Sequence, residues 1–115
     1  MKKIEYTPDA ADRMRAIKSE ISGRYGIEKA TKIVGRIANM IDNLAVFEQM
    51  GSSVEQMFGI PYDWRYIFVE RNYVFYRVEE DCIKVINIYN EKEDFMWSLF
   101  GICTTSEETN EYWKE

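Results

Sequence analysis

The sequence contains no histidine, and this absence excludes several kinds of chemistry at once. Ser-His-Asp and Cys-His nucleophile systems, histidine acid–base catalysis and the common zinc sites all require that residue. Cysteine is also scarce. Cys82 and Cys103 are too few for a disulfide framework, and they form no C-x-x-C motif. We therefore expect no metal and no other cofactor.

Long apolar runs are missing as well. No stretch of the sequence approaches the roughly 18 consecutive apolar residues of a transmembrane helix. The N-terminal MKKIEYTPDA has two lysines with no apolar run behind them, so it does not have the pattern of a signal peptide. Together with the cysteine usage, these features predict a cytoplasmic protein without membrane contact.

Positive charge is in short supply. The chain has 15 lysines and arginines against 20 aspartates and glutamates, a net charge of −5. Most of the imbalance lies in residues 60–115, which carry 6 bases and 12 acids. A protein that binds free nucleic acid usually has a basic patch, so this distribution disfavours such a partner.

The length of 115 residues suits one domain, and a hydrophobic content of 46% is typical of globular proteins. We predict one domain over residues 1–101 and an acidic C-terminal tail over residues 102–115.

Apolar residues recur at helical spacing in two consecutive segments. Thr7 and Pro8 are typical of a helix start, and Gly26 separates a first predicted helix, to residue 25, from a second that begins near residue 27. The short junction predicts an antiparallel helical hairpin.

Strand-like segments surround this hairpin in the sequence. Residues 2–6 predict an edge strand, and residues 65–70, 73–79 and 82–89 predict a three-stranded antiparallel meander. Residues 47–62 are interpreted as a loop, and residues 90–100 as a short helix. The order predicts an α+β fold, with the hairpin packed on one face of a single sheet.

Alternation within the strands assigns residues to the two sheet faces. We expect one set to face the helices: Val74, Tyr76, Val78, Ile86 and Ile88. We expect the other set to lie on an open face: Tyr73, Phe75, Arg77, Val85, Asn87 and Tyr89.

The order of these elements resembles the RelE/ParE superfamily, the toxins of type II toxin–antitoxin (plasmid stabilization, or addiction module) systems. The resemblance runs from IEYTPDAADRMRAI through GIEKATKIVGRIANMIDNL to WRYIFVERNYVFYRVEEDCIKVINIYNEKEDFMWSLFG. It implies a toxin neutralised by a cognate antitoxin. It also implies one of two activities: RelE-like mRNA cleavage at the ribosome, or ParE-like inhibition of DNA gyrase by protein contact.

The residues that RelE-like enzymes use for cleavage are largely replaced here. Tyr73 stands where the resemblance implies an arginine, residues 90–94 hold three acids and one lysine, and Trp97 occupies the position of a C-terminal tyrosine or histidine. The endoribonuclease activity is therefore disfavoured. If it exists, we expect Tyr89 to act in catalysis, with Arg65 or Arg77 holding the phosphate. The alternative is that both arginines pair with nearby glutamates.

A partner surface is predicted on the second helix and the segment after it. The candidate residues for antitoxin binding are Lys29, Lys32, Arg36, Met40 and Phe47, although a solvated helix face explains the basic residues equally well. A non-toxic relative that keeps only the fold is a third possibility beside the two kinds of toxin.

Overall fold

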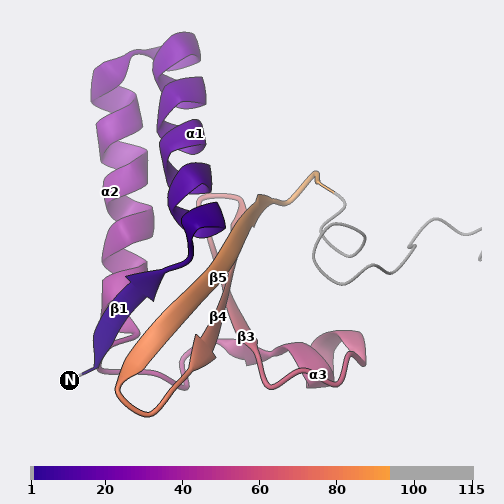
Figure 1. Cartoon of the computed structure of the whole chain (residues 1–115). Helices are drawn as coiled ribbons and strands as arrows, with labels where there is room; N and C mark the ends of the chain where they lie inside the picture. Colours follow the sequence, from indigo (N-terminus) through magenta and orange to yellow (C-terminus); the bar gives the residue numbers. More distant parts are fainter. Residues whose placement is uncertain (1, 94–115) are drawn as a thin grey trace, which may run out of the picture.

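The computed structural model describes residues 2–93 (Figure 1). Its elements, in chain order, are β1 (Lys3–Tyr6), α1 (Pro8–Tyr25), α2 (Ile27–Asn43), β2 (Ser52–Ser53), α3 (Val54–Phe58), β3 (Arg65–Val69), β4 (Asn72–Val78) and β5 (Cys82–Asn90). The predicted α+β class, helical hairpin and antiparallel meander are confirmed. The acidic tail and most of the predicted C-terminal helix lie outside the described residues.

The hairpin begins and turns where the sequence indicates. The Thr7 side chain accepts a hydrogen bond from the Ala10 amide at 3.1 Å, and Pro8 occupies the first turn, where its missing N–H leaves no bond unmade. Gly26 separates the helices at a φ of 96°, which a residue without Cβ adopts at little cost. α1 and α2 therefore lie side by side and antiparallel.

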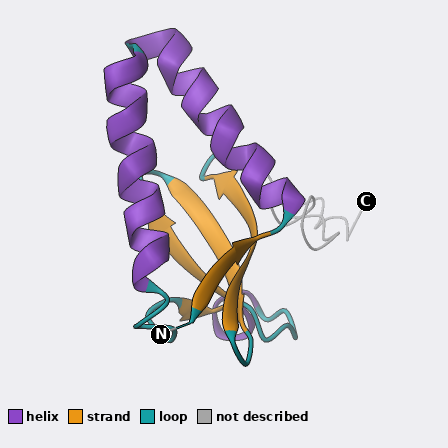
Figure 2. Ribbon diagram, turned by 60° about the vertical axis from the view of Figure 1, so that its left-hand side comes forward, coloured by secondary structure: helices purple, strands orange, loops and turns teal. Residues whose placement is uncertain are grey.

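The five strands form one mixed sheet in the order β1-β5-β4-β3-β2. β3, β4 and β5 pair antiparallel, whereas β1 pairs parallel with the first half of β5, so that Lys3 faces Cys82 and Tyr6 faces Val85. The helical hairpin covers one face of this sheet (Figure 2), which we call the inner face. None of the helices within residues 2–93 is long and apolar enough to span a membrane.

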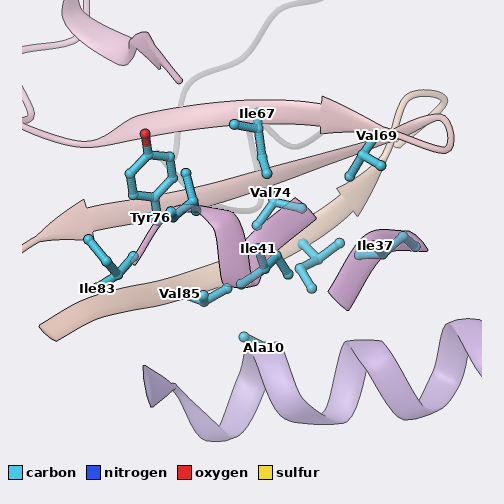
Figure 3. Packing of buried hydrophobic residues seen from close by; sticks show 11 residues of the cluster. Ala10, Ile37, Ile41, Ile67, Val69, Val74, Tyr76, Ile83 and Val85 are labelled. Carbon is cyan, nitrogen blue, oxygen red and sulfur yellow. The ribbon is translucent and has the colours of Figure 1, made fainter. Parts of the chain in front are cut away.

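The main core lies between the inner face and the hairpin. It is mostly aliphatic, and Figure 3 shows side chains from α1, α2 and the three meander strands meeting in this layer. Its buried members are Ala10, Ile37, Ile41, Leu44, Ile67, Val69, Val74, Tyr76, Ile83, Val85 and Ile88.

A β-bulge changes the predicted faces of β5. Phe75 pairs with Asn87, but the next residue, Tyr76, pairs with Val85, so Ile86 is an extra residue in the ladder. Alternation therefore shifts by one position. Val85 belongs to the inner core and Ile86 packs on the opposite face, the reverse of the prediction for both. The faces predicted for Val74, Tyr76 and Ile88 are confirmed.

The opposite face, which we call the outer face, is not open as predicted. It carries a second cluster around Phe75 and Tyr89, which are buried beneath Val54 and Ile60. Those two residues come from the segment predicted to be a loop, which contains β2 and α3. The Ser53 side chain accepts a hydrogen bond from the Gln56 amide at 3.2 Å and so starts α3.

The first turns of α1 cover the part of β5 that β1 leaves unpaired. The Thr7 hydroxyl donates to the Ile86 carbonyl at 2.7 Å, and Arg13 Nε donates to the Ile88 carbonyl at 2.8 Å. An uncovered strand edge exposes such groups to pairing with other chains. The side chains of the helix cap and of Arg13 thus satisfy two carbonyl groups of this edge.

Candidate functional site

Arg65 lies on the inner face, not on the face where a phosphate site was predicted. It pairs with Tyr76, and directly opposed residues of neighbouring strands point to the same side. Its guanidinium donates to the Gly51 carbonyl from Nε at 3.0 Å and from Nη2 at 2.7 Å. The structure does not show the alternative, in which Arg65 pairs with a glutamate. Arg65 instead holds the backbone after α2.

The same backbone is held by Tyr76. Its hydroxyl accepts a hydrogen bond from the Gly51 amide and donates one to the Glu48 carbonyl, both at 2.9 Å. Burial raises the pKa of this phenol above its usual value, and the bond from Gly51 lowers it in part. Tyr76 and Arg65 therefore fix residues 48–51 against the sheet.

Arg77 lies on the outer face and is paired as expected with a carboxylate. Both its Nε and its Nη2 contact Glu79, with Nε at 2.9 Å from Oε2. This contact raises the pKa of Arg77 and lowers the pKa of Glu79, since each charge favours the other. A phosphate at Arg77 would compete with Glu79, whose Oε2 accepts from both nitrogens.

Tyr89 is 9% exposed on the outer face, beneath Arg13. The Arg13 guanidinium lies 5.4 Å from the centre of the Tyr89 ring, and the hydroxyl accepts a hydrogen bond from Asn87 Nδ2 at 3.1 Å. Burial raises the pKa of Tyr89, and the nearby positive charge of Arg13 opposes that rise. A raised pKa makes the phenol a poorer base at neutral pH.

The three residues proposed for catalysis are thus not brought together. Arg65 and Arg77 occupy opposite faces of the sheet. Tyr89 pairs with Tyr73, four residues from Arg77 along β4, or roughly 13 Å at the usual rise of a strand. No two of the three converge on one point where a phosphate could bind.

The acidic segment after β5 pairs with arginines. Glu91 contacts Arg71 at 2.7 Å, and Glu93 contacts Arg13. Within residues 2–93 there is no group of three or more potential ligands placed to hold a metal ion.

The residues predicted to bind a partner separate into three environments. Lys29, Lys32 and Arg36 are exposed on α2, and Arg36 reaches Glu70 at 3.5 Å. Met40 is half-buried and packs against the main core, so only part of its side chain is open to a partner. Phe47 is 62% exposed in the turn after α2 and remains a contact candidate.

A groove lies where the helical hairpin extends past the end of the sheet. It has a volume of about 920 Å³ and lies between α1 and α2 on one side and the end of β5 with the β3–β4 turn on the other. Its apolar lining comes entirely from the hairpin: Ala16, Ile17, Ile21, Tyr25 and Ile33. Its volume lies in the range of ligand-binding clefts, whereas its lining is more polar than is usual for them.

Arg13 is the residue of this region that the sequence interpretation missed. It was not among the candidate residues, yet it contacts the Ile88 carbonyl, Glu93 and the Tyr89 ring. All three partners lie more than seventy positions along the chain. Helical periodicity carries no signal for such contacts, because it reports only the side of the helix on which a residue lies.

Comparison with known proteins gives the class that fits this fold. Residues 4–95 match the family described as "ParE toxin of type II toxin-antitoxin system, parDE". The chain therefore belongs to the ParE toxin family, within the RelE/ParE superfamily.

One similar solved structure is described as "Chromosomal ParDE TA system from P. aeruginosa". It is 25% identical in sequence with a TM-score of 0.64, and the match covers 78% of this chain and 96% of that chain. No curated protein matches the sequence.

Proposed function

We propose that this protein is the toxin of a type II toxin–antitoxin pair, that a cognate antitoxin neutralises it, and that it acts by contact with a protein target. DNA gyrase is the target that the ParE resemblance favours. The observation that carries the second half of this proposal is the separation of Arg65 from Arg77 by the full thickness of the sheet. A ribonuclease of this superfamily would need such cations on one surface.

Each candidate group also has a structural partner. Arg65 holds the Gly51 carbonyl and Arg77 holds Glu79, so binding an RNA phosphate would first break these contacts. Loss of a single well-placed donor to a transition state costs roughly 10² to 10³ in rate. With two donors engaged elsewhere, we expect no robust mRNA cleavage.

Two assays on the purified protein separate the candidate activities. In a supercoiling assay with purified DNA gyrase, the protein is expected to inhibit, and Arg77→Ala and Tyr89→Phe are expected to inhibit equally well. In a ribosome-programmed cleavage assay, the protein is expected to leave the message intact. Robust cleavage that is lost in either variant would establish the endonuclease instead.

The antitoxin is tested by co-expression with a small open reading frame beside this gene. A stable complex that buries on the order of 1,600 Å² is expected, together with relief of growth arrest. Failure to co-purify would contradict neutralisation by that protein. Absence of growth arrest on induction, together with no gyrase inhibition, would favour the non-toxic relative.

A further inference from the structure

The helical hairpin ends in an exposed apolar tip. Tyr25 is 65% exposed and Ile27 is 59% exposed, one on each side of the turn between α1 and α2, at the opposite end of the molecule from the N-terminus (Figure 1). Lys29 Nζ lies 5.9 Å from the centre of the Tyr25 ring. Lys29 and Lys32 are exposed on α2, and within residues 2–93 neither has a carboxylate partner, while Glu28 is the acid between Ile27 and Lys29. We call Tyr25, Ile27, Lys29 and Lys32 the tip surface, which combines apolar side chains with unpaired positive charge.

A second exposed apolar surface lies in the segment after α2. Val46 is 57% exposed and Phe47 is 62% exposed. Lys2 joins this segment to the turn between β4 and β5, because its amide donates to the Ala45 carbonyl at 3.3 Å and its Nζ donates to the Glu79 carbonyl at 2.7 Å. The two exposed apolar residues therefore lie at the same end of the molecule as the N-terminus and the β4–β5 turn.

Acidic side chains lie near Val46 and Phe47. Asp42 precedes them in the last turn of α2, and Asp81 lies in the β4–β5 turn, where its carbonyl accepts from the Lys3 amide at 3.4 Å. Both aspartates are exposed and neither has a cationic partner in the part of the chain that the structure describes; Lys3 is the exposed base beside them. We call Asp42, Val46, Phe47 and Asp81 the N-terminal surface, which combines apolar side chains with unpaired negative charge.

We propose that the tip surface of one molecule docks on the N-terminal surface of a second copy of this chain. A contact between two tip surfaces would bring lysines together, and a contact between two N-terminal surfaces would bring aspartates together, whereas the mixed contact pairs opposite charges. Because the two surfaces lie at opposite ends of the molecule (Figure 2), the contact is head-to-tail, and each pair of molecules still has one free surface of each kind.

The strength of this contact is limited by its size. Two exposed apolar side chains on each partner bury far less than the roughly 1,600 Å² of a standard interface, so the association is weak and depends on concentration. In sedimentation velocity, the average mass of the full chain is expected to rise above the monomer mass as the concentration approaches about 100 µM. It is expected to fall again in about 0.5 M salt, because exposed ion pairs are screened.

Two serine variants test whether the contact is head-to-tail. Ile27→Ser removes an apolar anchor from the tip surface, and Phe47→Ser removes one from the N-terminal surface. Each variant alone is expected to remain monomeric, because each chain keeps only one of the two surfaces. An equimolar mixture is expected to form dimers and nothing larger, since one kind of contact is left.

Met57→Ser is the matched control. Met57 is 58% exposed on α3, as exposed as Ile27, and it belongs to neither surface. This variant is expected to associate like the unchanged chain. All three serine variants alter exposed side chains, and circular dichroism checks that each remains folded.

Charge reversal tests the electrostatic part of the proposal. Lys29→Glu together with Lys32→Glu places acids opposite the aspartates, so association is expected to be lost. Adding Asp42→Lys and Asp81→Lys to the same chain reverses both surfaces and is expected to restore it. Restoration by the second pair of substitutions would show that the first pair had not unfolded the protein.

A chain that is monomeric at every concentration would overturn the proposal. The same holds for a mixture of the serine variants that stays monomeric or grows beyond dimers, for equal loss of association in Met57→Ser, and for charge reversal without rescue. Dimers formed by either serine variant alone would indicate a symmetric contact instead. The measurement uses the isolated full chain without antitoxin, gyrase or ribosome, so its outcome is independent of the proposed function.

Discussion

The two faces of the sheet are both apolar, but they are built from different side chains and covered to different degrees. The inner face packs aliphatic residues against two long helices, and Ile41, Val74 and Ile88 are fully buried there. The outer face packs aromatic rings beneath a short helix, and Phe68 at its rim remains 50% exposed while lying 4.9 Å, ring centre to ring centre, from Tyr73.

This difference in burial predicts that substitutions on the two faces will affect the stability of the domain to different degrees. Removal of a fully buried aliphatic side chain leaves a cavity that rigid neighbours cannot fill. Removal of a half-exposed ring loses only the contacts on its buried side, and water can fill the space that it leaves. The inner face is therefore expected to determine whether the domain folds, and the outer rim to tolerate change.

The strongest test of this comparison pairs one substitution from each face. Ile41→Ala on the inner side is expected to lower the free energy of unfolding by about 2–5 kcal/mol. Phe68→Ala on the outer rim is expected to cost about 1 kcal/mol or less, because half of its area is already in water. Urea titration followed by circular dichroism measures both, and equal losses would contradict the distinction.

A second substitution tests the close contact between the sheet and the segment after α2. A Cβ added at Gly51 would lie 2.5 Å from the Tyr66 carbonyl oxygen and 2.7 Å from the Tyr76 hydroxyl. Gly51→Ala is expected to cost about 1–3 kcal/mol, as overpacking does. Gly35→Ala is the control, because nothing lies within 4 Å of its added Cβ. If the Gly51→Ala protein were as stable as this control, residues 48–51 would be able to move away from the sheet without loss of stability.

The hydroxyl of Tyr76 is a polar group at the edge of the mostly aliphatic inner core. Tyr76→Phe keeps the ring but leaves the buried Gly51 amide without its acceptor, at an expected cost of about 1–2 kcal/mol. Hydrogen exchange at the Gly51 amide should accelerate relative to amides in β4. Unchanged exchange would mean that another acceptor replaces the phenol.

The smallest effect on stability is expected at Cys82. The pKa of this thiol is raised to about 11, mainly by burial and secondly by the hydrogen bond to Glu79. The unfolded thiol ionises near pH 8.5, so the native state retains its proton more tightly. Stability from this group is complete below about pH 8.5 and is lost as the pH rises towards about 11.

Comparison of the full chain with Cys82→Ala between about pH 8 and pH 11 isolates this contribution, since both proteins share the tyrosines that titrate in the same range. The free energy of unfolding should fall more steeply in the protein that keeps the thiol. Parallel profiles would show that Cys82 ionises equally in both states.

Much of the fold could be predicted because its signals are local. The helix cap at Thr7, the break at Gly26 and the alternation in β4 each depend on neighbouring residues. The bulge beside Tyr76 could not be predicted from the sequence, because an extra residue in one strand is defined only by the register of the neighbouring strand. The short β2 and α3 were missed for a related reason, since they exist through contacts with Trp64 and the outer face.

The candidate site was harder to predict than the fold. Arg65 and Arg77 are both strand arginines in the sequence, yet the pairing of Arg65 with Tyr76 directs it to the inner face. The groove at the end of the sheet combines hairpin residues with Asn72, at the start of β4, and Glu91, just after β5, and no short motif links them. Whether the residues of a site lie together depends on which distant segments the fold brings into contact.

The parallel pairing of β1 with β5 has a consequence for synthesis of the protein. Lys3 finds its strand partner only at Cys82, whereas the hairpin of α1 and α2 needs no residue beyond Asn43. During translation the hairpin can therefore form early, while β1 must wait for nearly the whole described domain. A chain released before residue 82 has no strand for β1 to join and no β5 edge for Arg13 to cover. An interrupted round of translation would thus leave the apolar residues of α2 without the sheet that buries them.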